Sequence, residues 1–407
     1  MKLKRASAAA AVFVISAALC SCGGNEPNDV AFVVALGFDK GTQSEYEITI
    51  QFAKADRISG GASESGGKPG SEIIQNVAVE APDIYSAINT ANHIVSKKFS
   101  LSHAKLLVFS RALAEEGIGD IADTMIRSNE IKPDVYIAVA KDTANGYLEE
   151  VKPVVEVNPA KYYRLIYGEN DSGGLPKTNL LNFYFNKETN RSGSVVPLAG
   201  VTETNEEGMD NAANKNAPVN DRDFEFQVKN YTAGEVAVDG ENKSEAMGMA
   251  VFSGDRMTGM LGSVDCELYN LLSGEIKRSY ISFRSGGGAA VVKLFRYKKP
   301  QYDIDIKRRH VVIKLFLESD LYSVPRGAGD IEETERDITR AVNEACEEFI
   351  VRARDELDCD ILGIESRIGG SFLIVDERAG YDFWQEFKEY TVEVDTAVEV
   401  RRAGMKS

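Results

Sequence analysis

The sequence predicts an α+β protein with more than one domain. A mixed α/β region at the N-terminus is followed by a strand-rich C-terminal region with one long helix. Strand and helix patterns alternate between residues 30 and 140, which is typical of α/β units. Strand patterns without intervening helices then follow between residues 246 and 317. A chain of 407 residues is long enough to form several hydrophobic cores, so a multidomain arrangement is expected.

The N-terminal region opens with a predicted hairpin. Residues 30–38 form an almost continuous apolar run, as in a strand buried on both faces, and residues 46–52 alternate as its partner. Because a strand–helix–strand order favours parallel pairing, part of this sheet is expected to be parallel. The later predicted elements are strands at 73–79, 104–109 and 135–140, with helices from Pro82 and at 112–127.

One long helix is predicted in the C-terminal region, from about residue 330 to 355. Its apolar residues recur on one face, acids cluster in its first turns and arginines in its last, as the helix dipole prefers. At 1.5 Å per residue it is about 40 Å long and must bury its apolar face against a sheet. The strands predicted in this region are 246–253, 256–262, 279–283, 290–297, 302–306, 310–317 and 392–400.

A polar stretch separates the two regions. Residues 202–223 include only Met209 and Val219 as larger apolar residues, so they are expected to form a linker or a long exposed loop. The predicted organisation is therefore a leader at 1–21, an N-terminal region at 22–201, the linker, and a C-terminal domain at 224–407.

The leader has the pattern of a bacterial lipoprotein signal. Basic residues precede an apolar run at 8–19, which is too short to span a bilayer, and the run ends in Leu19-Cys20-Ser21-Cys22. Cys22 has a leucine three positions before it and a small residue directly before it, whereas Cys20 follows the bulky Leu19. We therefore expect Cys22 to carry a diacylglycerol, which anchors stably because it has two acyl chains. The alternative is an ordinary signal peptide with incidental cysteines.

Charge and motifs exclude several functions. The net charge of −16 repels phosphate backbones, so nucleic-acid binding is not expected. The chain contains 3 histidines, and only His103 has a serine beside it; on a strand the two side chains would point to opposite faces. No nucleophile elbow, metal-binding motif or phosphate-binding loop is present. The sequence thus predicts no catalytic residue, no metal and no cofactor, and it names no ligand-binding residue.

Three cysteines lie beyond the leader: Cys266, Cys346 and Cys359. They form no short metal-binding spacing and are predicted to be small buried residues, while a bridge between Cys346 and Cys359 stays open. The aromatic clusters at 162–163 and 183–185 are expected to pack in the core, with a hydrophobic recognition patch as the alternative.

Several short motifs are spread over most of the chain after the leader: residues 26–31 (EPNDVA), 36–41 (LGFDKG), 102–110 (SHAKLLVFS), 127–132 (RSNEIK), 248–252 (GMAVF), 360–363 (DILG) and 398–404 (VEVRRAG). Together these motifs resemble the Ger(x)C family, the lipoprotein C subunits of spore nutrient-germinant receptors.

The resemblance implies a subunit that is not an enzyme. Family members are anchored through the lipid on the outer face of the spore inner membrane, and they act with membrane-embedded A and B subunits when amino acids, sugars or nucleosides trigger germination. Their fold is described as three mixed α/β domains, which implies that residues 22–201 contain two subdomains.

The chain departs from the family pattern at three places. Gly23 stands where a tryptophan usually follows the lipidated cysteine, residues 203–222 resemble an insertion, and the segment 366–379 replaces a basic, proline-containing stretch. Two other functions are alternatives. A lipoprotein substrate-binding protein of an importer would need two similar lobes around a cleft, and an exported cell-wall hydrolase would need a polar catalytic site.

Overall fold

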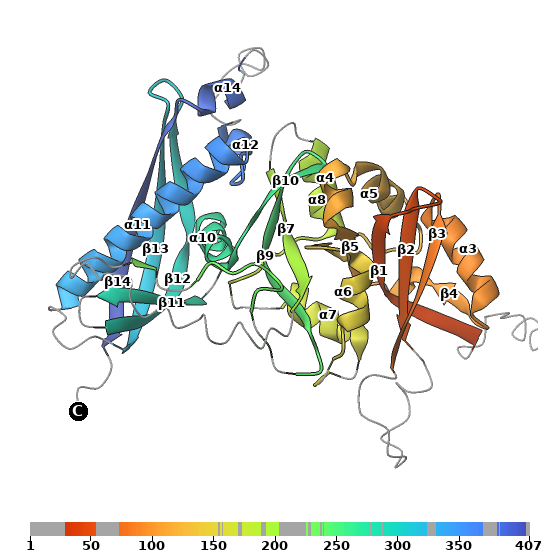
Figure 1. The fold of residues 1–407 in the computed structure, drawn as a ribbon. Coiled ribbons are helices and arrows are strands. Elements are labelled where there is room, and N and C mark those ends of the chain that lie inside the picture. The colour runs from red at the N-terminus through yellow and green to blue at the C-terminus, as the bar shows by residue number, and fades with distance from the viewer. Residues whose placement is uncertain are drawn as a thin grey trace, which may run out of the picture.

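The computed structural model describes two β-sheets that lie side by side (Figure 1). Helices and strands are both abundant, which confirms the α+β class. The described residues are 29–53, 73–153, 155–156, 158–169, 173–188, 193–202, 225–226, 229–236, 238, 240–276, 278–285, 288–323, 331–368, 381 and 383–403. Cys22, most of the linker at 202–223 and most of the segment 366–379 lie outside these residues.

The first sheet has nine strands in the order β10-β9-β7-β6-β5-β1-β2-β3, with β4 also pairing with β1. Its centre is parallel, since β1, β5, β6 and β7 run in one direction, and its two flanks are antiparallel hairpins. The strands are β1 Val30–Lys40, β2 Tyr46–Ala53, β3 Ile74–Ala81, β4 Lys98–Ser100, β5 Leu106–Ser110, β6 Tyr136–Ala140, β7 Gly193–Val201, β9 Ser244–Ser253 and β10 Arg256–Leu261.

Helices cover both faces of this sheet, so its central strands are buried on both sides. The predicted hairpin and parallel centre are confirmed. The single helix predicted at 112–127 is wrong in one respect, because the structure has two helices there. They are separated at Gly117, whose φ of 131° lies outside the helical range. The helices are α3 Ile84–Ile94, η2 Leu101–His103, α4 Arg111–Glu116, α5 Gly119–Ile126, α6 Ala144–Glu150, α7 Pro159–Tyr167 and α8 Leu180–Glu188.

The second sheet has five strands in the order β14-β13-β12-β11-β8, all antiparallel except for the β13–β14 pair. They are β8 Glu225–Phe226, β11 Arg278–Ser285, β12 Gly288–Asp305, β13 His310–Ser323 and β14 Thr391–Ala403. The strands predicted at 290–297 and 302–306 are one strand, β12, because the irregular stretch between them stays paired with β13.

The predicted long helix is present as α11, Ile331–Glu356, and it crosses this sheet diagonally (Figure 1). It buries Ile338, Val342, Cys346 and Phe349 against the strands. The shorter helices of this part are α10 Ser263–Ser273, α12 Ile364–Ile368 and α14 Phe383–Phe387.

Apart from the short β8, the chain passes from the first sheet to the second only after the predicted linker and two further strands. After residues 202–223 the chain first returns to the first sheet, where β9 pairs with β7 and β10 with β9. Only α10 and the elements after it, with the short β8, belong to the second sheet. The described residues thus form two sheets, where the family resemblance implies three domains; the domain boundaries themselves stay a prediction.

Candidate functional site

The two sheets share a hydrophobic core, which we call the junction. Val195 on β7 and Met249 and Val251 on β9 belong to the same buried cluster as residues of α10, α11 and the second sheet. Helix α10 lies between the two sheets (Figure 1). Because apolar contacts at the junction are continuous, the sheets are held together by burial as well as by the chain connections.

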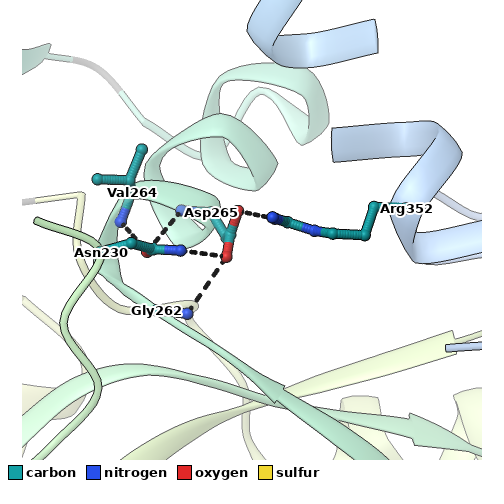
Figure 2. A network of polar contacts seen from close by, with 5 residues as sticks. All are labelled: Asn230, Gly262, Val264, Asp265 and Arg352. Atoms are coloured by element: carbon teal, nitrogen blue, oxygen red, sulfur yellow. Dashed lines mark hydrogen bonds and ion pairs between the residues drawn. The ribbon is translucent and has the colours of Figure 1, made fainter. Parts of the chain in front are cut away.

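A polar network marks the start of α10 (Figure 2). Asp265 is 4% exposed and its carboxylate pairs with the guanidinium of Arg352 on α11. The other carboxylate oxygen accepts from Asn230 Nδ2 at 2.6 Å and from the Gly262 N–H at 3.4 Å. Asn230 Oδ1 in turn accepts from the N–H groups of Val264 at 3.0 Å and Asp265 at 3.4 Å. Asn230 therefore caps α10, and the ion pair between the buried Asp265 and the partly exposed Arg352 connects α10 to α11.

Three further contacts join the sheets. Asn270 on α10 donates through Nδ2 to the carbonyl oxygens of Gly173 at 2.8 Å and Leu175 at 3.0 Å. The Asp360 carbonyl accepts from the N–H of Gly193, the first residue of β7, at 3.1 Å. The Asp360 carboxylate meanwhile accepts from the N–H groups that begin α12, Ile364 at 2.9 Å and Glu365 at 2.8 Å.

Burial shifts two carboxyl groups of the junction. Desolvation raises the pKa of Asp360 to about 6, although its two backbone hydrogen bonds work in the other direction. It raises the pKa of Glu267 on α10 to about 7, against a hydrogen bond from Ser279 Oγ at 3.0 Å. Burial disfavours the charged form of both groups relative to the unfolded chain, so the stability of the junction depends on pH.

The family-like motifs have structural roles in the first sheet. Asp39, at the end of β1, is buried and accepts from the N–H groups of Ala144 and Asn145, each at 2.8 Å, which caps α6. Glu130 Oε2, in the motif at 127–132, accepts at 3.2 Å from the N–H of Leu101, which directly precedes the motif at 102–110. These motifs connect elements to one another and do not converge on a reacting centre within the described residues.

Residues predicted from the sequence lie in the following places. Cys22 is outside the described residues, so its modification stays a prediction. The prediction that Ser102 and His103 point apart is wrong, because they lie in the 3₁₀ turn η2 and not on a strand; Ser102 Oγ and His103 Nδ1 are 3.0 Å apart. Both side chains are exposed, the imidazole packs on the Phe32 ring, and no described carboxylate contacts the imidazole as a Ser-His-Asp arrangement requires.

The three cysteines beyond the leader and two of the clustered aromatic rings lie in the core. Cys266, Cys346 and Cys359 are free and buried, as predicted, so the bridge left open between the last two does not form. Tyr163 and Phe183 are fully buried, which confirms core packing for these two rings, whereas Phe185 on α8 is 60% exposed.

The described residues line a small pocket and a larger groove. A pocket of about 150 Å³ beside Tyr46 is smaller than ordinary small-molecule sites, whereas a groove of about 780 Å³ between α11 and β14 lies within their range. The part of the chain that the structure describes contains no group of three or more metal-ligating side chains. None of its helices combines the length and apolar character needed to cross a bilayer.

Family models match both halves of the chain. The model described as "Spore germination protein N-terminal domain" matches residues 23–201. The model described as "Spore germination B3/ GerAC like, C-terminal" matches residues 247–404, from β9 to the end of β14.

Individual proteins agree with these matches. The chain is 25% identical over 175 residues to spore germination protein KC of Bacillus subtilis, covering 42% of this chain and 43% of that protein. It is 24% identical over 123 residues to the putative spore germination protein YfkR of the same organism, covering 30% of this chain and 32% of that protein. The matches therefore span less than half of either relative. The crystal structure of the GerBC protein shares the fold, with a TM-score of 0.52 at 10% identity over 90% of this chain and 97% of that one.

Proposed function

Because the chain belongs to the Ger(x)C family of spore germination proteins, we propose that it is the lipid-anchored C subunit of a nutrient germinant receptor at the spore inner membrane. The observation that carries this proposal is the match of both family halves, at 23–201 and 247–404, within one chain. In this role the protein helps to trigger germination through assembly with other subunits. It catalyses no reaction and needs no cofactor.

The proposed anchor keeps the first sheet close to the membrane. Only residues 23–29 separate Cys22 from β1, which begins at Val30. Even fully extended, such a segment reaches no further than about 25 Å. The membrane-embedded A and B subunits would therefore meet the first sheet and its loops before the second.

The junction supports a role for this protein as a scaffold between its partners. A shared hydrophobic core and the Asp265–Arg352 ion pair connect the two sheets, so a partner bound to one sheet has a fixed relation to a partner bound to the other. The importer alternative would need two similar lobes, whereas the two sheets differ in strand number, order and direction.

Replacement of the predicted lipidation site tests this function. In spores of the native host, Cys22→Ala is expected to abolish incorporation of labelled palmitate, to release the protein from the membrane fraction and to impair nutrient-triggered germination. The physical reason is the loss of both acyl chains. Cys20→Ala is the matched control, because it changes the neighbouring cysteine and should leave label, location and germination intact. Label that persists in Cys22→Ala would refute the anchor.

A further inference from the structure

The groove between α11 and β14 runs along an open sheet edge. β14 is an edge strand of the second sheet, and among the described residues it pairs only with β13. Alternate residues of an edge strand direct their N–H and C=O groups away from the sheet, where another strand can pair with them. Val394 and Val400 are two such residues, because their N–H groups bind side chains of α11 instead of β13.

Helix α11 satisfies this edge at two points. Glu347 Oε1 accepts from the Val394 N–H at 2.8 Å, and Glu335 Oε1 accepts from the Val400 N–H at 2.7 Å. Helix and strand run in opposite directions here. Four helical residues advance about 6 Å and two strand residues about 6.6 Å, so side chains spaced by four on α11 follow residues spaced by two on β14.

The same spacing leaves the middle of the edge open. Between the two glutamates the helical positions are Thr339 and Asn343, and the matching strand residues are Thr396 and Val398; all four line the groove. Asn343 and Thr339 have shorter side chains than glutamate. Among the described residues no side chain bonds the N–H groups of Thr396 and Val398 as the glutamates bond those of Val394 and Val400.

Two buried oxygens in this gap have no partner. Thr396 is 4% exposed, and neither its Oγ1 nor Asn343 Oδ1 is hydrogen-bonded to any described residue. Buried polar atoms normally have partners, so these two unpaired oxygens mark the stretch of the groove where the polar groups of helix and strand are left unsatisfied. The lining carries five glutamates against two arginines, which favours a positively charged occupant.

We propose that the open edge at Thr396 and Val398 binds an extended segment of a partner protein that carries basic side chains. The segment adds a short strand to β14, its backbone pairs with the N–H and C=O groups of these two residues, and its basic side chains meet the glutamates of the groove. This inference rests on the groove and does not depend on membership of a receptor.

Two synthetic peptides test the proposal. Binding of fluorescein-labelled Val-Lys-Val-Lys-Val and Val-Glu-Val-Glu-Val to the purified full-length chain is measured by fluorescence anisotropy. The lysine peptide is expected to bind at least tenfold more tightly. Equal binding of the two peptides, or no binding of the lysine peptide, would overturn the proposal.

Matched variants identify the edge. Val398→Pro removes one outward N–H and leaves the bonds to β13 in place, since proline is tolerated on edge strands, whereas Val398→Ala keeps the N–H. The proline variant should bind the lysine peptide at least tenfold more weakly than the alanine variant. Equal binding by the two variants would refute binding at the β14 edge. If Val398→Pro does not fold, binding of the lysine peptide is compared between Asn343→Glu and Asn343→Ala. A glutamate at 343 should close the gap and weaken binding by a similar factor.

A second copy of the chain is the competing occupant. Sedimentation of the wild type and Val398→Pro distinguishes it from a basic segment. A wild-type dimer that the proline substitution dissociates would assign the edge to self-association and overturn the proposal, while a monomer in both supports it.

Discussion

Replacing Arg352 with methionine is expected to lower the free energy of unfolding by about 2–4 kcal/mol. Asp265 would then remain buried at 4% exposure without its counter-ion. Removing one partner of a buried pair is costly because the other charge is left in a poorly solvated site. Asn230 and Gly262 still donate to Asp265, so they offset part of this cost. Urea unfolding of the two proteins at pH 7 measures the difference.

A second arginine on the same helix is the matched control. Arg340 pairs with Asp337 at 2.9 Å in an exposed position, so Arg340→Met is expected to cost less than about 1 kcal/mol. The double variant Asp265→Asn/Arg352→Met removes both charges and should recover part of the loss. If Arg352→Met is no more destabilising than Arg340→Met, the ion pair with the buried Asp265 does not hold α10 to α11.

Replacing Glu267 with glutamine is expected to raise stability at pH 8 and to leave it unchanged near pH 4. Burial raises the pKa of Glu267 in the folded protein from 4.5 to about 7, so the folded state binds this proton more tightly than the unfolded chain. The carboxyl therefore stabilises most below pH 4.5, and that contribution is lost as the pH rises to about 7. Glutamine cannot ionise, so the gain at pH 8 should be on the order of 2–3 kcal/mol.

Unfolding by urea at several pH values measures this gain. Glu275→Gln, in an exposed position just after α10, is the control and should leave the pH dependence as it is. Some pH dependence remains in Glu267→Gln because burial also raises the pKa of Asp360 to about 6. A gain of equal size at pH 4 and pH 8 would contradict the assignment of Glu267 as the titrating group.

Local patterns predicted much of the fold because they depend on neighbouring residues. The hairpin of β1 and β2 follows from an apolar run, a turn and an alternating partner, and α11 follows from one apolar face with complementary charges at its ends. Gly117 was a visible signal for the break between α4 and α5. Its effect depends on a φ of 131°, which the periodicity of the flanking residues does not reveal.

Long-range pairing could not be predicted in the same way. Strands β9 and β10 have ordinary strand patterns, and nothing local in them indicates that they return to the first sheet beside β7. Asp265 and Arg352 likewise form a pair only because α10 and α11 meet in the folded chain.

The lipidation site and the groove differ in the same way, because one depends on local sequence and the other on long-range contacts. Cys22 is predicted entirely from adjacent residues, through the spacing that a lipoprotein signal requires. The groove could not be predicted in this way. Glu335, Thr339, Asn343 and Glu347 form a stripe spaced by four in the sequence, but the strand edge that they face lies some fifty residues further along the chain.

Co-purification from detergent-solubilised spore membranes tests the central claim, that this chain is the C subunit of a germinant receptor, most directly. With a tagged wild-type protein we expect to recover two membrane-embedded proteins, one of them similar to permeases, and with Cys22→Ala their yield should fall because the chain is no longer held at the bilayer. Recovery of an importer's ATPase and channel in their place, or of no membrane protein at all, would contradict the account.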